Sequence, residues 1–200
     1  MSLRYLIRSP ETNIEDVADY LDALPHHHRL WETRKLKIFD QARLFRKAGH
    51  GPAVSVEHFV PAAVPDVTEV IHHGTNTFPM LTTFQKRFAR PEGESARLFG
   101  YNEGITKSVL GPGCFVVHGT AGNPPWANRG ALVVDYYLVP DGPVPPGWPR
   151  VISNKQGLQK FVYAGTRDFM RRVSRHVSVG RAFKGEKALH AYFVLCREDH

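Results

Sequence analysis

Cysteine is scarce in this chain: only Cys114 and Cys196 occur in 200 residues. Two thiols cannot build the disulfide framework on which small secreted domains depend. Both lie in apolar, strand-like runs, "CFVVHG" and "AYFVLC", where a free cysteine commonly behaves as a small buried hydrophobic side chain. The sequence therefore predicts two reduced, buried thiols, and neither a disulfide nor a nucleophilic cysteine.

Long apolar runs are also missing. No run of about 18 apolar residues is present, so no transmembrane helix is predicted. The first residues, "MSLRYLIRSPET", lack the apolar stretch and the small-residue cleavage site of a signal peptide. A hydrophobic content of 42% and a charged content of 22% are ordinary for a soluble globular protein. We therefore expect a cytoplasmic protein with a single domain over residues 1–200.

The motifs of well-known chemistries are absent as well. We find no glycine-rich phosphate loop, nucleophile elbow, paired CxxC or zinc-protease helix. The histidines from His26 to His28 follow a proline at a helix start, and consecutive helical side chains point about 100° apart. They then cannot share one metal ion, although an extended stretch would let His26 and His28 face the same way. We predict an exposed surface there, and neither a metal site nor a cofactor.

Among the charged residues, Lys and Arg outnumber Asp and Glu by 26 to 19, which gives a net charge of +7. This excess favours anionic partners in general: nucleic acid, phosphate or acidic lipid headgroups. It does not choose among them. No block of five or six like charges is present, so a basic nucleic-acid-binding tail is excluded.

Mostly helical spacing characterises the part of the chain before residue 95. Four helices are predicted over residues 12–24, 26–49, 66–74 and 77–90, with a short strand over residues 54–60. Asp66 and Gly74 stand where the two caps of the third helix belong. In the fourth, Met80, Phe84 and Phe88 recur at every fourth residue, which indicates one apolar helix face.

After residue 95 the spacing changes to short β-rich runs separated by turns. Four strands are predicted in "ARLFGY", "ITKSVL", "CFVVHGT" and "ALVVDYYLV", then a long helix over residues 153–176, and finally a hairpin over residues 177–196. The sum predicts an α+β fold with a helical N-terminal half. Its curved antiparallel sheet, or partial barrel, has about six strands, with the long helix inserted before the C-terminal hairpin.

A carboxylate and an imidazole stand out in the predicted sheet. Asp135 interrupts the apolar run "ALVVDYYLV", and His118 follows the apolar residues of "CFVVHGT". A carboxylate beside an imidazole is the usual way to orient a general base. We predict that the two pair on the sheet interior, which Tyr137 and Arg181 also line. The alternative, that Asp135 faces water, stays open because the sequence does not define the strand register.

Other polar candidates lie near predicted turns. Tyr101 and Glu103 belong to "FGYNEG", where Glu103 is a candidate acid or base, although "NEG" is also good turn chemistry. His73, in the last turn of the helix over 66–74, and Asn76 just after it form a candidate polar corner of a pocket. The alternative for this pair is simple helix capping.

Three functions follow as hypotheses. The first is binding of a small, partly apolar and anionic molecule in a pocket between the sheet and the helices, with acid–base catalysis by His118, Glu103 and Asp135 as an option. The second is binding of nucleic acid or an anionic surface through a basic stripe on the long helix, formed by Arg167, Arg171 and Arg175. The third is an interaction module that forms a homodimer.

Overall fold

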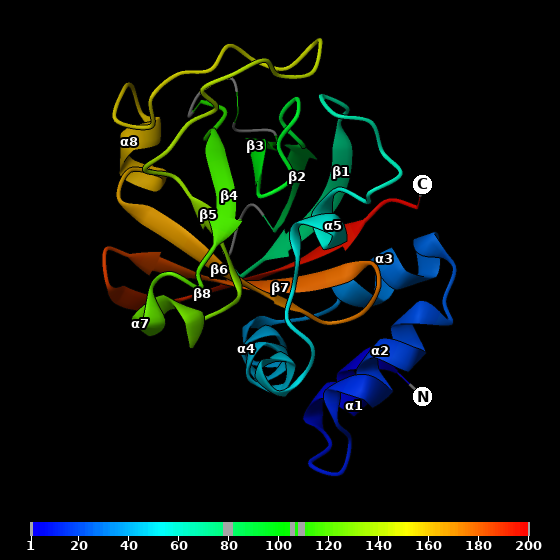
Figure 1. Cartoon of the computed structure of the whole chain (residues 1–200). Helices are drawn as coiled ribbons and strands as arrows, with labels where there is room; N and C mark the ends of the chain where they lie inside the picture. Colours follow the sequence, from blue (N-terminus) through cyan, green and yellow to red (C-terminus); the bar gives the residue numbers. More distant parts are fainter. Residues whose placement is uncertain (1, 78–81, 105–106, 108–110, 200) are drawn as a thin grey trace.

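A computed structural model, which describes residues 2–77, 82–104, 107 and 111–199, shows a closed barrel of antiparallel strands (Figure 1). Each strand pairs with its neighbours in chain order, and the last strand pairs with the first. The strands are β1 (Val70–Asn76), β2 (Thr83–Ala89), β3 (Arg97–Glu103), β4 (Phe115–Gly119), β5 (Leu132–Asp135), β6 (Thr166–Arg172), β7 (Val177–Lys184) and β8 (Lys187–Arg197). Closure leaves none of the eight described strands with a free edge.

Short helices surround the barrel. They are α1 (Leu3–Arg8), α2 (Ile14–Asp22), α3 (His26–Arg34), α4 (Ile38–Lys47), η1 (Ala48–His50), α5 (Val56–Phe59), α7 (Pro124–Ala127) and α8 (Gln159–Val162). The first four lie together against the outside of β7, β8 and β1, whereas α8 lies near one barrel end (Figure 1). None of the helices in the described ranges is long and apolar enough to cross a bilayer.

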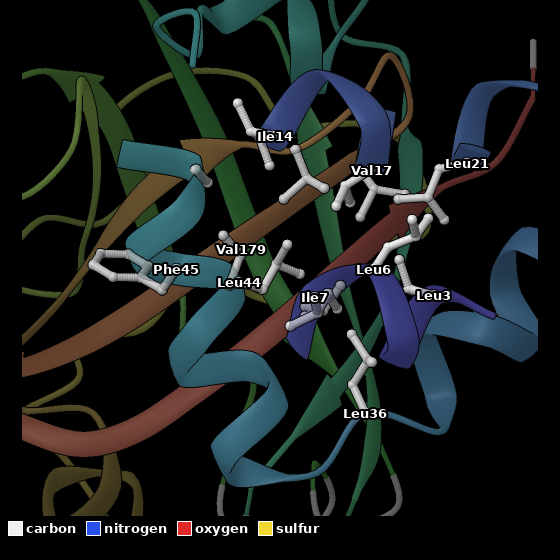
Figure 2. Packing of buried hydrophobic residues seen from close by; sticks show 14 of the residues in the cluster. Leu3, Leu6, Ile7, Ile14, Val17, Leu21, Leu36, Leu44, Phe45 and Val179 are labelled. Atoms are coloured by element: carbon white, nitrogen blue, oxygen red, sulfur yellow. The ribbon is translucent and has the colours of Figure 1, made fainter. Parts of the chain in front are cut away.

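The first core lies between the N-terminal helices and the outer face of the barrel. Leu6, Val17 and Leu44 come from three different helices and meet Val179 of β7 (Figure 2). All four side chains are buried, and each buried aliphatic side chain contributes about 1.5–3 kcal/mol. The apolar spacing of residues 12–24 therefore predicted α2 correctly, and residues 26–49 form α3, α4 and η1 as expected.

The second core fills the barrel interior. Alternate strand residues point inward, so Val117 on β4, Val134 on β5 and Met170 on β6 share one inner face. Gly100 and Gly180 also lie on this face, where an added Cβ would collide with the rings of Phe115 and Phe193. These two glycines let aromatic rings lie flat across the neighbouring strand.

The predicted α+β fold is wrong, because three segments predicted as helices or as parts of helices form strands. Residues 66–74 lead into β1, and residues 153–176 contain only the four-residue α8 before β6. Residues 77–90 contain β2, while positions 78–81 of that segment lie outside the described residues. A repeat of four residues fits a strand as well as a helix, since four is twice the strand period.

Two smaller predictions also differ from the structure. The short strand predicted over residues 54–60 is the helix α5, whose Phe59 is fully buried at one end of the barrel. Of the predicted strand "ITKSVL", only Lys107 falls among the described residues. The strands predicted in "ARLFGY", "CFVVHGT" and "ALVVDYYLV", and the C-terminal hairpin, are confirmed as β3, β4, β5 and β7–β8.

Candidate functional site

A lysine side chain lies inside the barrel. Lys86 is on β2 between Phe84 and Phe88, and the strand register places all three side chains on the inner face. Lys86 is only 2% exposed. Lysine is almost never fully buried unless its ammonium is paired, so this position requires partners.

Three polar side chains meet the Lys86 amine: Asn102 of β3, Tyr136 directly after β5, and Asp168 of β6. Lys86 Nζ donates to Asn102 Oδ1 at 2.9 Å and also to the hydroxyl of Tyr136, and it lies 3.3 Å from Asp168 Oδ2. The Tyr136 hydroxyl in turn donates to Asp168 Oδ2 at 3.3 Å. We call Lys86, Asn102, Tyr136 and Asp168 the lysine cluster. All four residues are buried.

Aromatic rings enclose the lysine cluster. The distance from Lys86 Nζ to the ring centroid is 4.9 Å for Phe115 and 5.1 Å for Phe193. Ring faces at this distance attract a cation, and their hydrocarbon excludes water. Tyr163, half-buried at the end of α8, stacks on Tyr136 with 5.2 Å between the ring centroids. The amine therefore has one carboxylate, one amide and one hydroxyl as partners in an otherwise apolar enclosure.

Burial shifts both ionisable ends of the cluster toward their neutral forms. Desolvation lowers the pKa of Lys86, and the nearby Asp168 carboxylate only partly opposes it. Desolvation likewise raises the pKa of Asp168 against the opposing effect of the Lys86 charge. The pKa of Tyr136 is raised well above its ordinary value by burial and by Asp168. The pair can thus exist as ammonium and carboxylate or, after one proton transfer, as amine and carboxylic acid.

Such a pair has chemical potential beyond packing. A lysine with a lowered pKa supplies a neutral amine, which acts as a base or as a nucleophile toward carbonyl groups. A carboxylic acid at hydrogen-bond distance can return the proton. The sequence reading missed Lys86 and Asp168 because both segments were interpreted as helices, in which these residues faced solvent. The available signal was Lys86 between two phenylalanines at strand spacing in "FQKRF"; the segment "RDFMR" gives no such signal for Asp168.

The predicted pair of His118 and Asp135 is present, but on the outer face of the barrel. His118 Nε2 lies 3.6 Å from Asp135 Oδ2, and Arg167 Nε donates to the same oxygen at 2.8 Å. The backbone N–H of Tyr137 donates to Asp135 Oδ1 at 2.8 Å. We call Asp135, His118 and Arg167 the outer network. The Arg167 guanidinium lies over the ring of Trp126, which follows the two prolines of α7.

The position predicted for this pair, on the sheet interior, is wrong. Asp135 and its partners in register, Val116 and Arg167, face outward, since the interior positions alternate with them. Asp135 is nevertheless buried. Burial alone would raise the pKa of Asp135, but hydrogen bonds from His118 and Arg167 outweigh it and lower the pKa. The hydrogen bond that His118 donates to Asp135 raises the pKa of His118 against the effect of burial.

The remaining predicted site residues are scattered over the barrel wall. Tyr101 donates to Glu103 Oε2 at 3.2 Å on the outer face, and Lys107 binds the same oxygen at 2.6 Å. His73 Nε2 lies 2.7 Å from Glu198 Oε1 on the outer face of β1. These pairs do not converge with the outer network on a single site.

Three further candidates are also apart from one another. Asn76 is on the inner face at the end of β1, where its backbone N–H donates to Thr82. Arg181 Nε donates to the Leu189 carbonyl at 3.1 Å on the outside of the β7–β8 hairpin. The exposed Tyr137 donates its hydroxyl to the Gly165 carbonyl. The predicted pocket lined by these residues is not formed by them.

The basic stripe predicted on a long helix is wrong as well, because that helix does not exist. Arg167 and Arg171 lie on the outer face of β6, and Arg175 is in the turn that leads to β7. The Arg171 guanidinium already donates to the carbonyls of Phe45, Arg129 and Asn128. It ties the N-terminal helices to the loop that follows α7, and so is not a free phosphate contact.

A second group of polar side chains occupies the opposite end of the barrel interior. His58 of α5 is buried, and desolvation together with the charges of His72, Arg197 and Arg172 lowers its pKa well below the ordinary value. Those neighbours are all basic, which keeps the imidazole neutral. Among the described residues no three His, Cys, Asp or Glu side chains, those of His26–His28 included, are grouped to hold a metal ion.

We compared the chain with protein-family models, with curated proteins and with solved structures, and none of them matches it. The features on which a function can be argued are the closed eight-stranded antiparallel barrel and the lysine–carboxylate pair in its interior.

Proposed function

We propose that the barrel binds a small, partly apolar molecule in its interior and that Lys86 contacts a carboxylate or carbonyl oxygen of that molecule. The observation that carries the proposal is the buried Lys86 amine, enclosed by aromatic rings and held by one carboxylate. A buried ion pair contributes little to stability compared with apolar side chains of the same volume. A barrel of eight strands is also about the size that holds one small ligand.

An apolar surface next to the lysine cluster supports the same proposal. Phe161 is 72% exposed, Leu158 is 51% exposed, and both belong to the segment that carries α8. Tyr163 follows directly and stacks on Tyr136 of the cluster. Exposed apolar groups of this kind mark sites where ligands or partners bind. We propose that a ligand approaches over this surface, displaces the Tyr163 ring and reaches Lys86.

The proposal assigns the acid–base roles to new residues. Lys86 and Asp168 replace His118, Glu103 and Asp135, because among these five residues only the former two lie on the inner face of the barrel, among apolar side chains. Asn102 holds the amine in place: its side-chain N–H donates to the carbonyl of Gly113 at 3.1 Å, while its oxygen accepts from Lys86. Such second contacts fix the rotamer of a reactive group.

Methyl NMR with benzoate as the probe tests the proposal. Met170 is fully buried on the inner face, two residues from Asp168 on β6, and it is one of only three methionines in the chain. With 13C-methyl methionine, benzoate should move the Met170 signal in a saturable way. The double variant Lys86→Leu/Asp168→Leu should lose this response, whereas the control Lys187→Leu, at an exposed position, should keep it. A Met170 signal whose chemical shift does not change with millimolar benzoate would overturn the proposal.

A further inference from the structure

Building on the proposed function, we infer that Lys86 forms a covalent imine with small, partly apolar aldehydes or ketones, so that the molecule bound in the barrel is a carbonyl compound. The inference rests on the arrangement of the lysine cluster, in which Lys86 Nζ lies 3.3 Å from the only carboxylate that it contacts among the described residues, and that carboxylate is also buried.

The first requirement of an imine is a neutral amine. Lys86 and Asp168 are both buried, and transfer of one proton between them removes two buried charges. The lowered pKa of Lys86 and the raised pKa of Asp168 both favour this transfer. An exposed lysine of ordinary pKa, in contrast, has about one neutral amine in a few thousand at pH 7.

The second requirement is an acid at the reacting centre. The Lys86 nitrogen attacks the carbonyl carbon, a C–N bond forms, and the C=O π electrons move to oxygen, which takes the proton of the Asp168 carboxylic acid. The nitrogen then returns a proton to the Asp168 carboxylate, leaving a neutral carbinolamine. Asp168 next protonates the hydroxyl group, water leaves, and the nitrogen lone pair forms the C=N bond. The products are a protonated imine, the Asp168 carboxylate and one water, and no oxidant or reductant is consumed.

The third requirement is an environment that accepts the product. A protonated imine carries its positive charge at the place where the ammonium of Lys86 stood. There Asp168 is the counter-ion. The ring centroids of Phe115 and Phe193 lie 4.9 and 5.1 Å from the Lys86 nitrogen, where ring faces attract a cation. The Tyr136 hydroxyl, which already accepts from Lys86, is placed to bind the oxygen that becomes water. The cluster thus suits the cationic imine as well as the ammonium.

Reductive trapping tests the inference. We would incubate the native protein at pH 7 with benzaldehyde and sodium cyanoborohydride, which reduces an imine to a stable secondary amine, and map the benzylated lysines by peptide mass spectrometry. Lys86 should be labelled at least roughly tenfold faster than the exposed Lys187, since its amine is neutral more often. Tyr163→Ala should raise the Lys86 rate further by opening the barrel end, without affecting Lys187.

Control variants separate the inference from loss of folding. Asp168→Asn removes the acid but keeps the size of the side chain, so Lys86 labelling should slow while the Lys187 rate and the circular dichroism spectrum stay unchanged. Excess benzoate should protect Lys86 alone. A Lys86 that labels only after unfolding in urea, while benzoate still shifts Met170, would overturn the imine and leave the proposed function standing. The absence of both signals would overturn both.

Discussion

The lysine cluster and the outer network, each with one aspartate, lie on opposite faces of the barrel wall at β5 and β6. Asp135 is the last residue of β5 and Tyr136 follows it, while Arg167 and Asp168 are neighbours on β6. Because successive strand residues point to opposite faces, Asp135 and Arg167 belong to the outer network, whereas Tyr136 and Asp168 belong to the lysine cluster. One short stretch of barrel wall thus holds a carboxylate on each side.

The two carboxylates respond oppositely to burial. Asp135 receives hydrogen bonds from Arg167, His118 and a backbone N–H, and these lower its pKa in spite of desolvation. Asp168 has one lysine and one tyrosine hydroxyl as partners, and desolvation raises its pKa. The opposite shifts have two causes: Asp135 has more hydrogen-bond donors, and Asp168 is more deeply desolvated. The outer carboxylate stays ionised and holds structure, while the inner one can exchange a proton.

Removal of Lys86 should have the largest effect. Lys86→Leu leaves Asp168 without its cation inside the barrel, and breaking a buried pair from one side costs about 3–5 kcal/mol. The double variant Lys86→Leu/Asp168→Leu should recover most of this loss, because an apolar pair leaves no buried charge. Urea unfolding at pH 8 measures both. A single variant as stable as the wild type would show that the inner pair carries no charge.

The cost of Lys86→Leu should also depend on pH. In this variant Asp168 loses its counter-ion, so its folded pKa rises further above the unfolded value of about 3.9. A raised carboxyl pKa gives stability that is present below the unfolded pKa and lost as pH rises through the folded one. The free energies of unfolding of the single and double variants should therefore differ little at about pH 4 and strongly at about pH 8. A gap of constant size would contradict this prediction.

Asp135→Asn tests the outer network, with an intermediate effect. The amide can still accept from the Tyr137 backbone N–H, but it no longer carries a charge for His118 and Arg167. We expect a loss of roughly 1–2 kcal/mol and a fall in the pKa of His118. Histidine NMR titration measures the pKa directly. An unchanged His118 pKa would mean that the charge of Asp135 does not stabilise the protonated His118.

The pH dependence of Asp135→Asn has a defined sign. The folded pKa of His118 is raised, so its contribution to stability is present below the unfolded pKa of about 6.5 and is lost as pH rises through the folded value. The variant should accordingly lose more stability at about pH 5.5 than at about pH 8.5. For Lys86→Leu the loss of stability should instead grow as the pH rises, so the two faces of the barrel wall should respond oppositely to pH.

Two neighbouring tyrosines give the smallest and most closely matched comparison. Tyr136→Phe removes a buried hydroxyl that serves Lys86 and Asn102, at an expected cost of about 1–2 kcal/mol. Tyr137→Phe removes an exposed hydroxyl bound to one carbonyl, and its effect should stay within about 0.5 kcal/mol. Equal losses in urea unfolding would contradict the assignment of the two faces.

Parts of this fold could be predicted from the sequence. The apolar spacing of α2 predicted that helix correctly, and the short β-branched and aromatic runs in "CFVVHGT" and "ALVVDYYLV", bounded by turn residues, predicted β4 and β5 correctly. The strands β2 and β6 could not be recognised in this way. Lys86 and Asp168 occupy inward positions that are apolar in an ordinary strand, so the alternation is broken where the site lies.

The lysine cluster could not be predicted for the same reason, and also because the sequence does not define the register of the strands. The pairing of His118 with Asp135 was predicted, but which face they share depends on how β4 and β5 align with the rest of the barrel. Lys86 and Asp168 are 82 positions apart, on strands that are not adjacent, and only closure of the barrel brings them together. No local pattern encodes such a contact.

The most direct test of the central claim is an NMR titration of the lysine side chains in the native protein, labelled with 13C at Cε. One signal, absent in Lys86→Leu/Asp168→Leu, should titrate below the ordinary lysine pKa of about 10.4, because burial favours the neutral amine. The Asp168→Asn variant should lower that pKa further by removing the counter-charge. If the Lys86 signal instead titrates with the exposed lysines, or stays protonated beyond them, the inner pair is a fixed salt bridge and the account of Lys86 as a reactive amine is wrong.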